Sequence, residues 1–421
     1  MLKRLAGDAI LLGAVRIGGM ALSLAFLLAL ARFTTPEVLG GIATTISVSL
    51  IAGLLVSGNY GAGAIRFLPE LQPTERGAYV REGCRLLVRR AFACWALVAA
   101  VALLGAAWPT FQLPNAWLAG LLLAPLTAWL RLIPTYVAAL GQVVRASLPH
   151  NVVRPALLLS GLAALVFALP TLGWTQALTI YIAALVLAVV TQHWLFRGVL
   201  PTPSAAAANP EWRRTGYALL MTALFLELSV DLVVVIGATV LTEANTGGLS
   251  IVMRTQALAL FGVTSINMVA SPRISAAHAS GDSQLVNKLL RQSAYLKLCV
   301  ALSTYVVVWL FAEWLLNLFG AAYVAYADAL RWAALTPLIM ALAGPVVLLA
   351  TLTARHRRAQ RAFVEAFGLL AALGTLAGWR YGVIGVVLAF VIAWAYWHLR
   401  LAWDLTSACR YSFTLLPARQ A

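Results

Sequence analysis

The chain has 421 residues, of which 62% are hydrophobic and 10% are charged, and its mean hydropathy is +0.89. A soluble domain of average composition carries about 25% charged residues, so this composition excludes an ordinary soluble globular protein. The formal net charge is +16, but no basic stretch carries the interleaved aromatic residues or the folded module that nucleic-acid binding needs.

A membrane-spanning helix needs roughly 20 mostly apolar residues, and about twelve stretches of the chain meet that measure. In chain order they cover residues 9–31, 38–60, 91–111, 115–141, 152–173, 175–197, 215–240, 247–269, 295–319, 329–353, 362–380 and 382–406. The first follows Lys3 and Arg4, as a secretory signal would, but it is too long for a signal and has no convincing cleavage site. We therefore predict an all-α integral membrane protein with a retained first helix.

Basic residues fall in alternate gaps between these stretches. One side holds roughly 24 of them, against about three on the other, which is a strong positive-inside bias. The three are Arg32, Arg331 and Arg380. We therefore predict a multi-pass protein with both termini in the cytoplasm and a basic cytoplasmic face that suits anionic membrane lipids and anionic substrates.

The patterns of enzymes and metal proteins are missing from the sequence. The four cysteines form no CxxC pair and the five histidines have no ligand spacing on one helix. No GxxxxGK[ST] phosphate loop occurs, and the hydrophilic gaps are short, the longest covering about residues 66–90 and 270–294. We predict a carrier rather than an enzyme, with no cofactor and no metal.

An internal repeat is consistent with a carrier, because transporters are often built from two related halves. Sliding the chain by 207 positions brings several residues into register in the same order without a gap. The aligned positions are Thr35 with Thr242, Gly40 and Gly41 with Gly247 and Gly248, and Arg66 with Arg273. We predict six-helix lobes at residues 1–200 and 215–421, joined by a cytoplasmic linker at 201–214. The alternative, that positive-inside loops produce similar spacing in any such protein, stays open.

Three N-terminal segments resemble a known family. They are Arg32-Phe33-Thr34-Thr35-Pro36-Glu37-Val38-Leu39-Gly40, Gly58-Asn59-Tyr60-Gly61 and Ile65-Arg66-Phe67-Leu68-Pro69-Glu70. They are similar to the polysaccharide (O-antigen type) flippases of the multidrug/oligosaccharidyl-lipid/polysaccharide exporter superfamily. The sequence departs from that pattern at Val38-Leu39, where an aromatic residue before the glycine is usual.

The resemblance implies a MATE-like fold of two parallel six-helix lobes around a central cavity. It also implies a bacterial inner-membrane flippase that moves undecaprenyl-diphosphate-linked oligosaccharide to the periplasmic leaflet by alternating access, for surface polysaccharide assembly. A polysaccharide polymerase and export machinery are then candidate partners.

Ionisable residues inside a span cost about 2.5–3.5 kcal/mol at the helix centre, so each needs a reason. A guanidinium offers the forked donors that phosphate oxygens accept. We therefore expect Arg16 and Arg254 to bind the substrate headgroup, with a structural ion pair as the alternative for each. Arg131 is a third candidate for headgroup binding, because Pro134 kinks the same helix and frees a carbonyl that could line a cavity. Arg16 and Arg254 are also favoured by the resemblance, since the lipid II flippase branch carries cavity arginines on its first and eighth helices.

Glu227 and Asp231 lie four residues apart, so one helix would place both carboxylates on one face. Two close carboxylates in a low dielectric cannot both ionise cheaply, which is the chemistry of a site that couples transport to H⁺ or Na⁺. The alternative is that Asp231 neutralises Arg254. Arg66 and Arg273 are expected at the cytoplasmic mouth, to collect substrate or to hold topology.

Two other functions compete with the flippase. An ion-coupled multidrug exporter of the same fold would favour a net negative cavity, whereas the three inner arginines outnumber the two acids. A polysaccharide polymerase or ligase would need a large periplasmic loop, and every outer gap is short.

Overall fold

The structure is a computed structural model that describes residues 2–107, 113–167, 169, 171–204, 207, 209–353 and 356–406. Their regular elements are all helices, as the composition predicts. The C-terminal tail, residues 407–421, was predicted to be cytoplasmic and lies outside the described residues.

The chain divides into two compact units, Met1–Leu232 and Val233–Ala421. The division falls inside the predicted seventh span, whereas the sequence places the linker at 201–214. The segment from residue 201 to residue 232 therefore belongs to the first unit.

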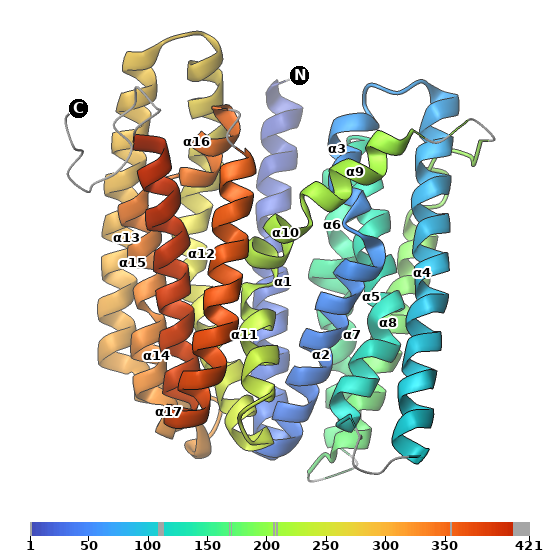
Figure 1. Ribbon diagram of the computed structural model, residues 1–421, viewed down its shortest axis with the longest axis vertical. Coiled ribbons are helices and arrows are strands. Elements are labelled where there is room, and N and C mark those ends of the chain that lie inside the picture. The colour runs from blue at the N-terminus through green and yellow to red at the C-terminus, as the bar shows by residue number, and fades with distance from the viewer. Residues whose placement is uncertain are drawn as a thin grey trace. The chain divides into compact units, whose positions relative to one another are not determined.

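The first unit contains all helices from α1 to α10 and the start of α11 (Figure 1). Its elements are α1 (Leu2–Phe33), α2 (Pro36–Ser57), η1 (Tyr60–Gly63), α3 (Ala64–Phe67), α4 (Pro73–Ala107), α5 (Asn115–Ala139), α6 (Val143–Leu148), η2 (Pro149–Val153), α7 (Arg154–Val166), α8 (Trp174–Leu195), α9 (Pro210–Ala218) and α10 (Leu220–Glu227). The helix α11 (Ser229–Ala238) begins in this unit and ends in the second.

Small and hydroxyl residues let α2 and α5 lie very close together. A Cβ on Gly53 would lie 2.3 Å from Thr127 Oγ1, and the Thr127 hydroxyl donates to the Ser49 carbonyl at 2.6 Å. Thr44 and Thr45 donate to carbonyls one turn earlier in their own helix, at 2.9 Å each. Most hydroxyls of the second span therefore serve helix packing rather than a polar cavity.

The short helix α9 is fixed to the first unit by aromatic packing and ion pairs. Trp212 is buried, with its ring centroid 5.0 Å from that of Tyr79. Arg213 forms an ion pair with the buried Glu82, and Arg66 lies 3.6 Å from Glu211. The end of the predicted cytoplasmic linker and the start of the predicted seventh span are thus docked on α3 and α4.

The second unit holds the remaining helices. They are α12 (Glu243–Ala279), α13 (Ser283–Asn317), η3 (Ala321–Tyr326), α14 (Ala327–Ala333), α15 (Leu335–Ala343), α16 (Val346–Leu352) and α17 (His356–Thr406). Gly382 has φ 63° and ψ −142°, which breaks α17 into two halves. Its halves lie side by side, since the Tyr396 hydroxyl donates to Glu365 at 2.8 Å. The break separates the predicted spans 362–380 and 382–406.

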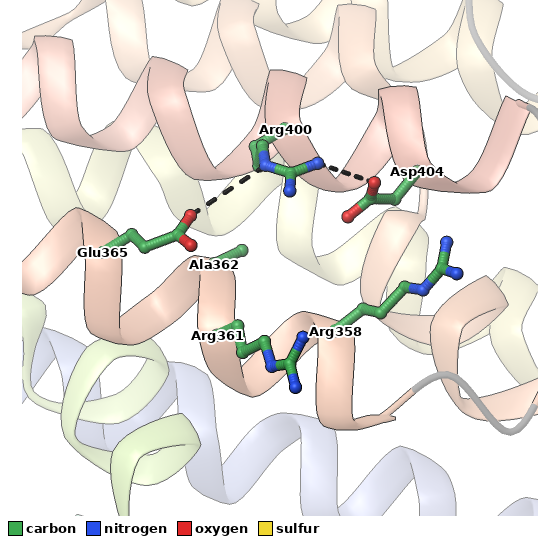
Figure 2. A pocket seen from close by; sticks show the side chains of 6 residues that line it. All are labelled: Arg358, Arg361, Ala362, Glu365, Arg400 and Asp404. Carbon is green, nitrogen blue, oxygen red and sulfur yellow. Dashed lines mark hydrogen bonds and ion pairs between the residues drawn. The ribbon is translucent and has the colours of Figure 1, made fainter.

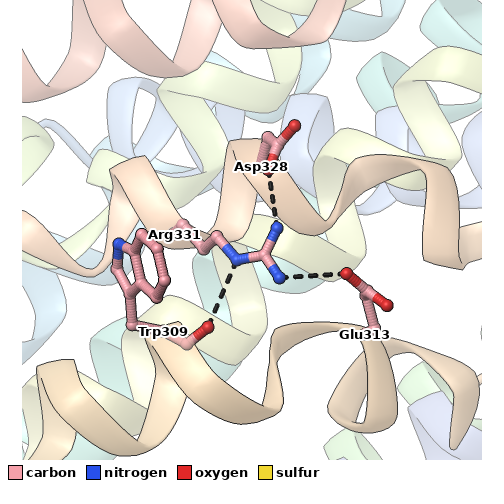
Figure 3. A network of polar contacts seen from close by, with 4 residues as sticks. All are labelled: Trp309, Glu313, Asp328 and Arg331. Atoms are coloured by element: carbon pink, nitrogen blue, oxygen red, sulfur yellow. Dashed lines mark hydrogen bonds and ion pairs between the residues drawn. The ribbon is translucent and has the colours of Figure 1, made fainter.

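An arginine-centred cluster links α13 to α14 in this unit (Figure 3). Arg331 donates to Asp328 at 2.7 Å, to Glu313 at 3.0 Å and to the Trp309 carbonyl at 3.2 Å. Its guanidinium also lies 5.5 Å from the centre of the Trp309 ring. The predicted outer-side arginine is therefore a structural contact between neighbouring helices.

Within the described residues, nine helices are long and apolar enough to cross a membrane, and a bent pair adds a tenth. Two features raise that number towards the predicted twelve: α17 contains two halves, and the shorter α7 coincides with the predicted span 152–173. The prediction of an all-α polytopic membrane fold is confirmed.

Candidate ion and substrate site

The seventh span is broken in its middle. The segments Pro210–Glu227 and Ser229–Ala238 meet at an angle of 77°, with Leu228 at φ −119° and ψ 21° between them. Interrupted helices inside a membrane are tolerated only where protein or a water-filled cavity satisfies the freed backbone groups. In secondary transporters such breaks are where substrates and coupling ions bind.

Arg131 and Glu227 form an ion pair at this break. Arg131 comes from α5 and its side chain is 21% exposed, whereas that of Glu227 is 56% exposed at the last position of α10. Pro134 follows in the same helix and has no N–H, so the carbonyl of Leu130 loses its helical donor. The expected headgroup arginine therefore lies beside a weakened stretch of α5, with its charge matched by Glu227.

Asp231 lies on the other side of the break, in the first turn of α11. Its side chain is buried and accepts a hydrogen bond of 2.8 Å from the Ser47 hydroxyl of α2. Ser47 is also buried, and it differs from the neighbouring hydroxyls because it donates to a carboxylate rather than to its own helix. A buried carboxylate at a helix break is a group that can take up H⁺ by protonation or bind Na⁺ through its oxygen atoms.

The prediction that Glu227 and Asp231 share one helix face is wrong. The four-residue spacing assumed an unbroken helix, and the chain bends by 77° between the two residues. Each carboxylate consequently has a different partner: Arg131 for Glu227 and Ser47 for Asp231. Both residues still lie beside the break, so the ion-coupling role stays a prediction on a different geometry.

The other predicted headgroup arginines lie elsewhere. Arg16 is exposed on α1 in the first unit. Arg254 is half-buried on α12 in the second unit, where its Nε donates to Ser250 Oγ at 3.3 Å. The headgroup roles of Arg16 and Arg254 therefore stay predictions.

The two predicted mouth residues differ in their surroundings. Arg66 is exposed and pairs with Glu211 of α9, which supports a structural role for it. Arg273 is exposed within the continuous helix α12. The repeat therefore places matching arginines in unlike local structures.

The sequence did not single out two buried polar side chains, those of Ser47 and Lys297. Ser47 was one hydroxyl among several in the second span, and only its contact with Asp231 distinguishes it. Lys297 lies near the start of the predicted span 295–319, and its side chain is fully buried in α13, where its Nζ has no hydrogen-bond partner among the described residues. No spacing in the sequence could show the Ser47–Asp231 contact or the burial of Lys297, since both depend on how helices rotate against one another.

Comparison with known proteins identifies the fold. A family described as MatE matches residues 220–364, which is less than half of the chain. No curated protein matches this sequence.

The described residues contain no group of three or more His, Cys, Asp or Glu side chains arranged to hold a metal ion.

Several solved structures share this architecture over nearly the whole chain. One is an inward-facing multidrug resistance MATE family transporter of the MOP superfamily, with a TM-score of 0.72 at 15% identity, covering 95% of this chain and 98% of that one. Another is the lipid II flippase MurJ in an inward closed conformation, with a TM-score of 0.58 at 12% identity, covering 94% and 87%.

A third is a MOP superfamily transporter from Pyrococcus furiosus whose binding pocket is described as having reverse polarity. It has a TM-score of 0.58 at 13% identity and covers 95% of each chain. The chain therefore has the fold of MOP superfamily transporters and flippases. The MATE-like architecture expected from the N-terminal segments is confirmed.

Proposed function

We propose that this protein is an ion-coupled membrane transporter of the MOP type whose substrate is an undecaprenyl-diphosphate-linked oligosaccharide. The observation that carries the proposal is the broken seventh span, which places the Arg131–Glu227 ion pair and the buried Asp231 on either side of Leu228. A charged pair beside a helix break can be closed or open. Ion binding or protonation at the carboxylate weakens its attraction to the arginine and so favours the open arrangement.

The substrate class is supported by the flippase-like N-terminal segments and by the basic residues Arg16 and Arg254. Glu227 already neutralises Arg131, so the positive charge available to an anionic substrate is smaller than the count of inner arginines implies. Arg131 would bind a diphosphate only when Glu227 is protonated or displaced. That exchange provides a physical route by which ion binding and substrate binding are coupled.

Glycolipid analysis in the source organism tests the substrate. Deletion of the gene should cause undecaprenyl-diphosphate oligosaccharide to accumulate while surface polysaccharide falls, and wild-type protein should reverse both. An Arg16→Ala variant and an Arg131→Gln variant should fail to reverse them. Unchanged glycolipids in the deletion strain would refute the substrate assignment.

Ion coupling is tested by Glu227→Gln and Asp231→Asn in proteoliposomes with an imposed H⁺ or Na⁺ gradient. Both variants should lose the response of transport to the gradient. Glu313→Gln is the matched control, because Glu313 also pairs with an arginine but at no helix break. A gradient response that survives in both site variants would remove the coupling role.

An ion-coupled multidrug exporter is the second candidate, because the MatE family matches residues 220–364 and a multidrug MATE transporter shares the fold. A buried carboxylate at Asp231 also suits an organic cation. New sensitivity to cationic drugs in the deletion strain, with normal glycolipids, would establish this function instead.

A further inference from the structure

A cavity of about 310 Å³ lies between the two halves of α17. Its lining residues are Arg358, Arg361, Ala362, Glu365, Arg400 and Asp404. Figure 2 shows these side chains around one space, with Arg400 between the two carboxylates. Three guanidiniums and two carboxylates thus leave the lining with an excess of positive charge.

The two carboxylates are already matched within the cavity. Arg400 lies 2.6 Å from Asp404 and 3.9 Å from Glu365, and Glu365 also accepts from the Tyr396 hydroxyl. These contacts neutralise one guanidinium and hold it in place. The excess charge therefore belongs to Arg358 and Arg361.

Arg358 and Arg361 have no ion-pair or hydrogen-bond partner among the residues that the structure describes, and both are exposed. They lie in the first two turns of α17, which begins at His356. A helix N-terminus favours negative charge and disfavours cations. The two arginines therefore repel each other and the helix end unless an anion lies between them.

The predicted spans place the cavity at one membrane surface, at the depth of lipid headgroups. Arg358 and Arg361 immediately precede the predicted span 362–380, and Arg400 and Asp404 are near the end of the predicted span 382–406. Both ends belong to the side predicted to be cytoplasmic, where anionic lipids concentrate. The forked donors of arginine match phosphate oxygens in geometry as well as charge.

We propose that this cavity binds a phosphate group, held by Arg358 and Arg361 while Arg400 is fixed by Asp404 and Glu365. The phosphate comes either from the headgroup of an anionic phospholipid or from a soluble phosphate compound. The proposal does not rest on the proposed transport function, because all of the lining residues belong to the two halves of α17.

Binding is measured on the purified full-length protein by native mass spectrometry with phosphatidylglycerol added to the detergent micelles. The double variant R358Q/R361Q should lower the lipid affinity by about tenfold or more, whereas R357Q is the matched control and should change it little. Arg357 precedes Arg358 in the same exposed turn but does not line the cavity. R358K/R361K should restore part of the affinity, because lysine keeps the charge but lacks the fork.

Competition separates the two sources of phosphate. If inorganic phosphate or glycerophosphoglycerol at millimolar concentration displaces the lipid from the wild type, the site accepts a free phosphate compound. If neither competes, it requires an intact lipid. Equal binding by wild type and R358Q/R361Q would overturn the proposal, and so would an equal loss in R357Q, which would indicate a diffuse basic surface.

Discussion

The helices α2 and α12 begin in the same way and end differently. The Thr35 hydroxyl accepts from the Val38 N–H at 3.4 Å, and the Thr242 hydroxyl accepts from the Asn245 N–H at 3.3 Å. Then α2 ends at Ser57, whereas α12 continues to Ala279. Two segments that align at an offset of 207 residues thus share a start and not an end.

The residues at the point of divergence give the reason. Gly58 and Asn59 adopt φ values of 57° and 52°, and the aligned residues of α12 are Ser265 and Ile266. A β-branched residue does not adopt positive φ at reasonable cost, so α12 stays helical. The break in α2 creates the surface on which α9 docks. Local backbone chemistry therefore separates two otherwise similar segments.

The largest effect is expected at Gly58. A Gly58→Ala change costs about 1–2 kcal/mol for the left-handed backbone. It would also displace Arg90, whose Nη1 lies 2.1 Å from the new Cβ and donates to the Val56 carbonyl. We expect a total loss of about 2–3 kcal/mol in the free energy of unfolding, once about 1 kcal/mol for that hydrogen bond is added. Denaturant titration in mixed micelles measures it.

Ser265→Ala is the matched control for Gly58→Ala. It lies in the interior of α12 and should change the stability by less than about 0.5 kcal/mol. Equal losses in the two variants would show that the left-handed turn does not cause the divergence.

A smaller effect is expected where the two helices meet aromatic rings. A Cβ on Gly248 would lie 2.2 Å from the Tyr326 ring, which is held by a 2.9 Å hydrogen bond to Asn245. A Cβ on Gly41 would lie 3.0 Å from the Trp174 ring. Gly248→Ala should therefore cost about 1–3 kcal/mol by overpacking, and Gly41→Ala less. The reverse order in thermal unfolding midpoints would contradict this comparison.

The smallest effect is expected at the shared start. Thr35→Ala and Thr242→Ala should each cost about 1 kcal/mol, because each removes one N-cap acceptor. Thr→Ser at either position keeps the acceptor and should restore most of the stability. Markedly unequal losses, measured by the same denaturant titration, would mean that the two starts are not equivalent.

Much of the fold was predictable because bilayer length and backbone satisfaction leave few options for apolar segments. The N-terminal segments with Thr35-Pro36 and Gly58-Asn59 also indicated the superfamily fold. For the candidate site, the sequence predicted which charged residues take part but not which side chains are in contact. Arg131, Glu227 and Asp231 were named from their cost inside a span, but the Ser47 contact and the shared-face error both depended on the break at Leu228.

By itself the sequence determined the class of protein and the approximate positions of the spans, because these depend on hydrophobicity along the chain. Only the tertiary structure decided that Glu227 pairs with Arg131 and that Arg358, Arg361 and Arg400 surround one cavity. Such contacts join residues far apart in the chain. They depend on helix rotation and on bends at single residues, which hydropathy and spacing do not specify.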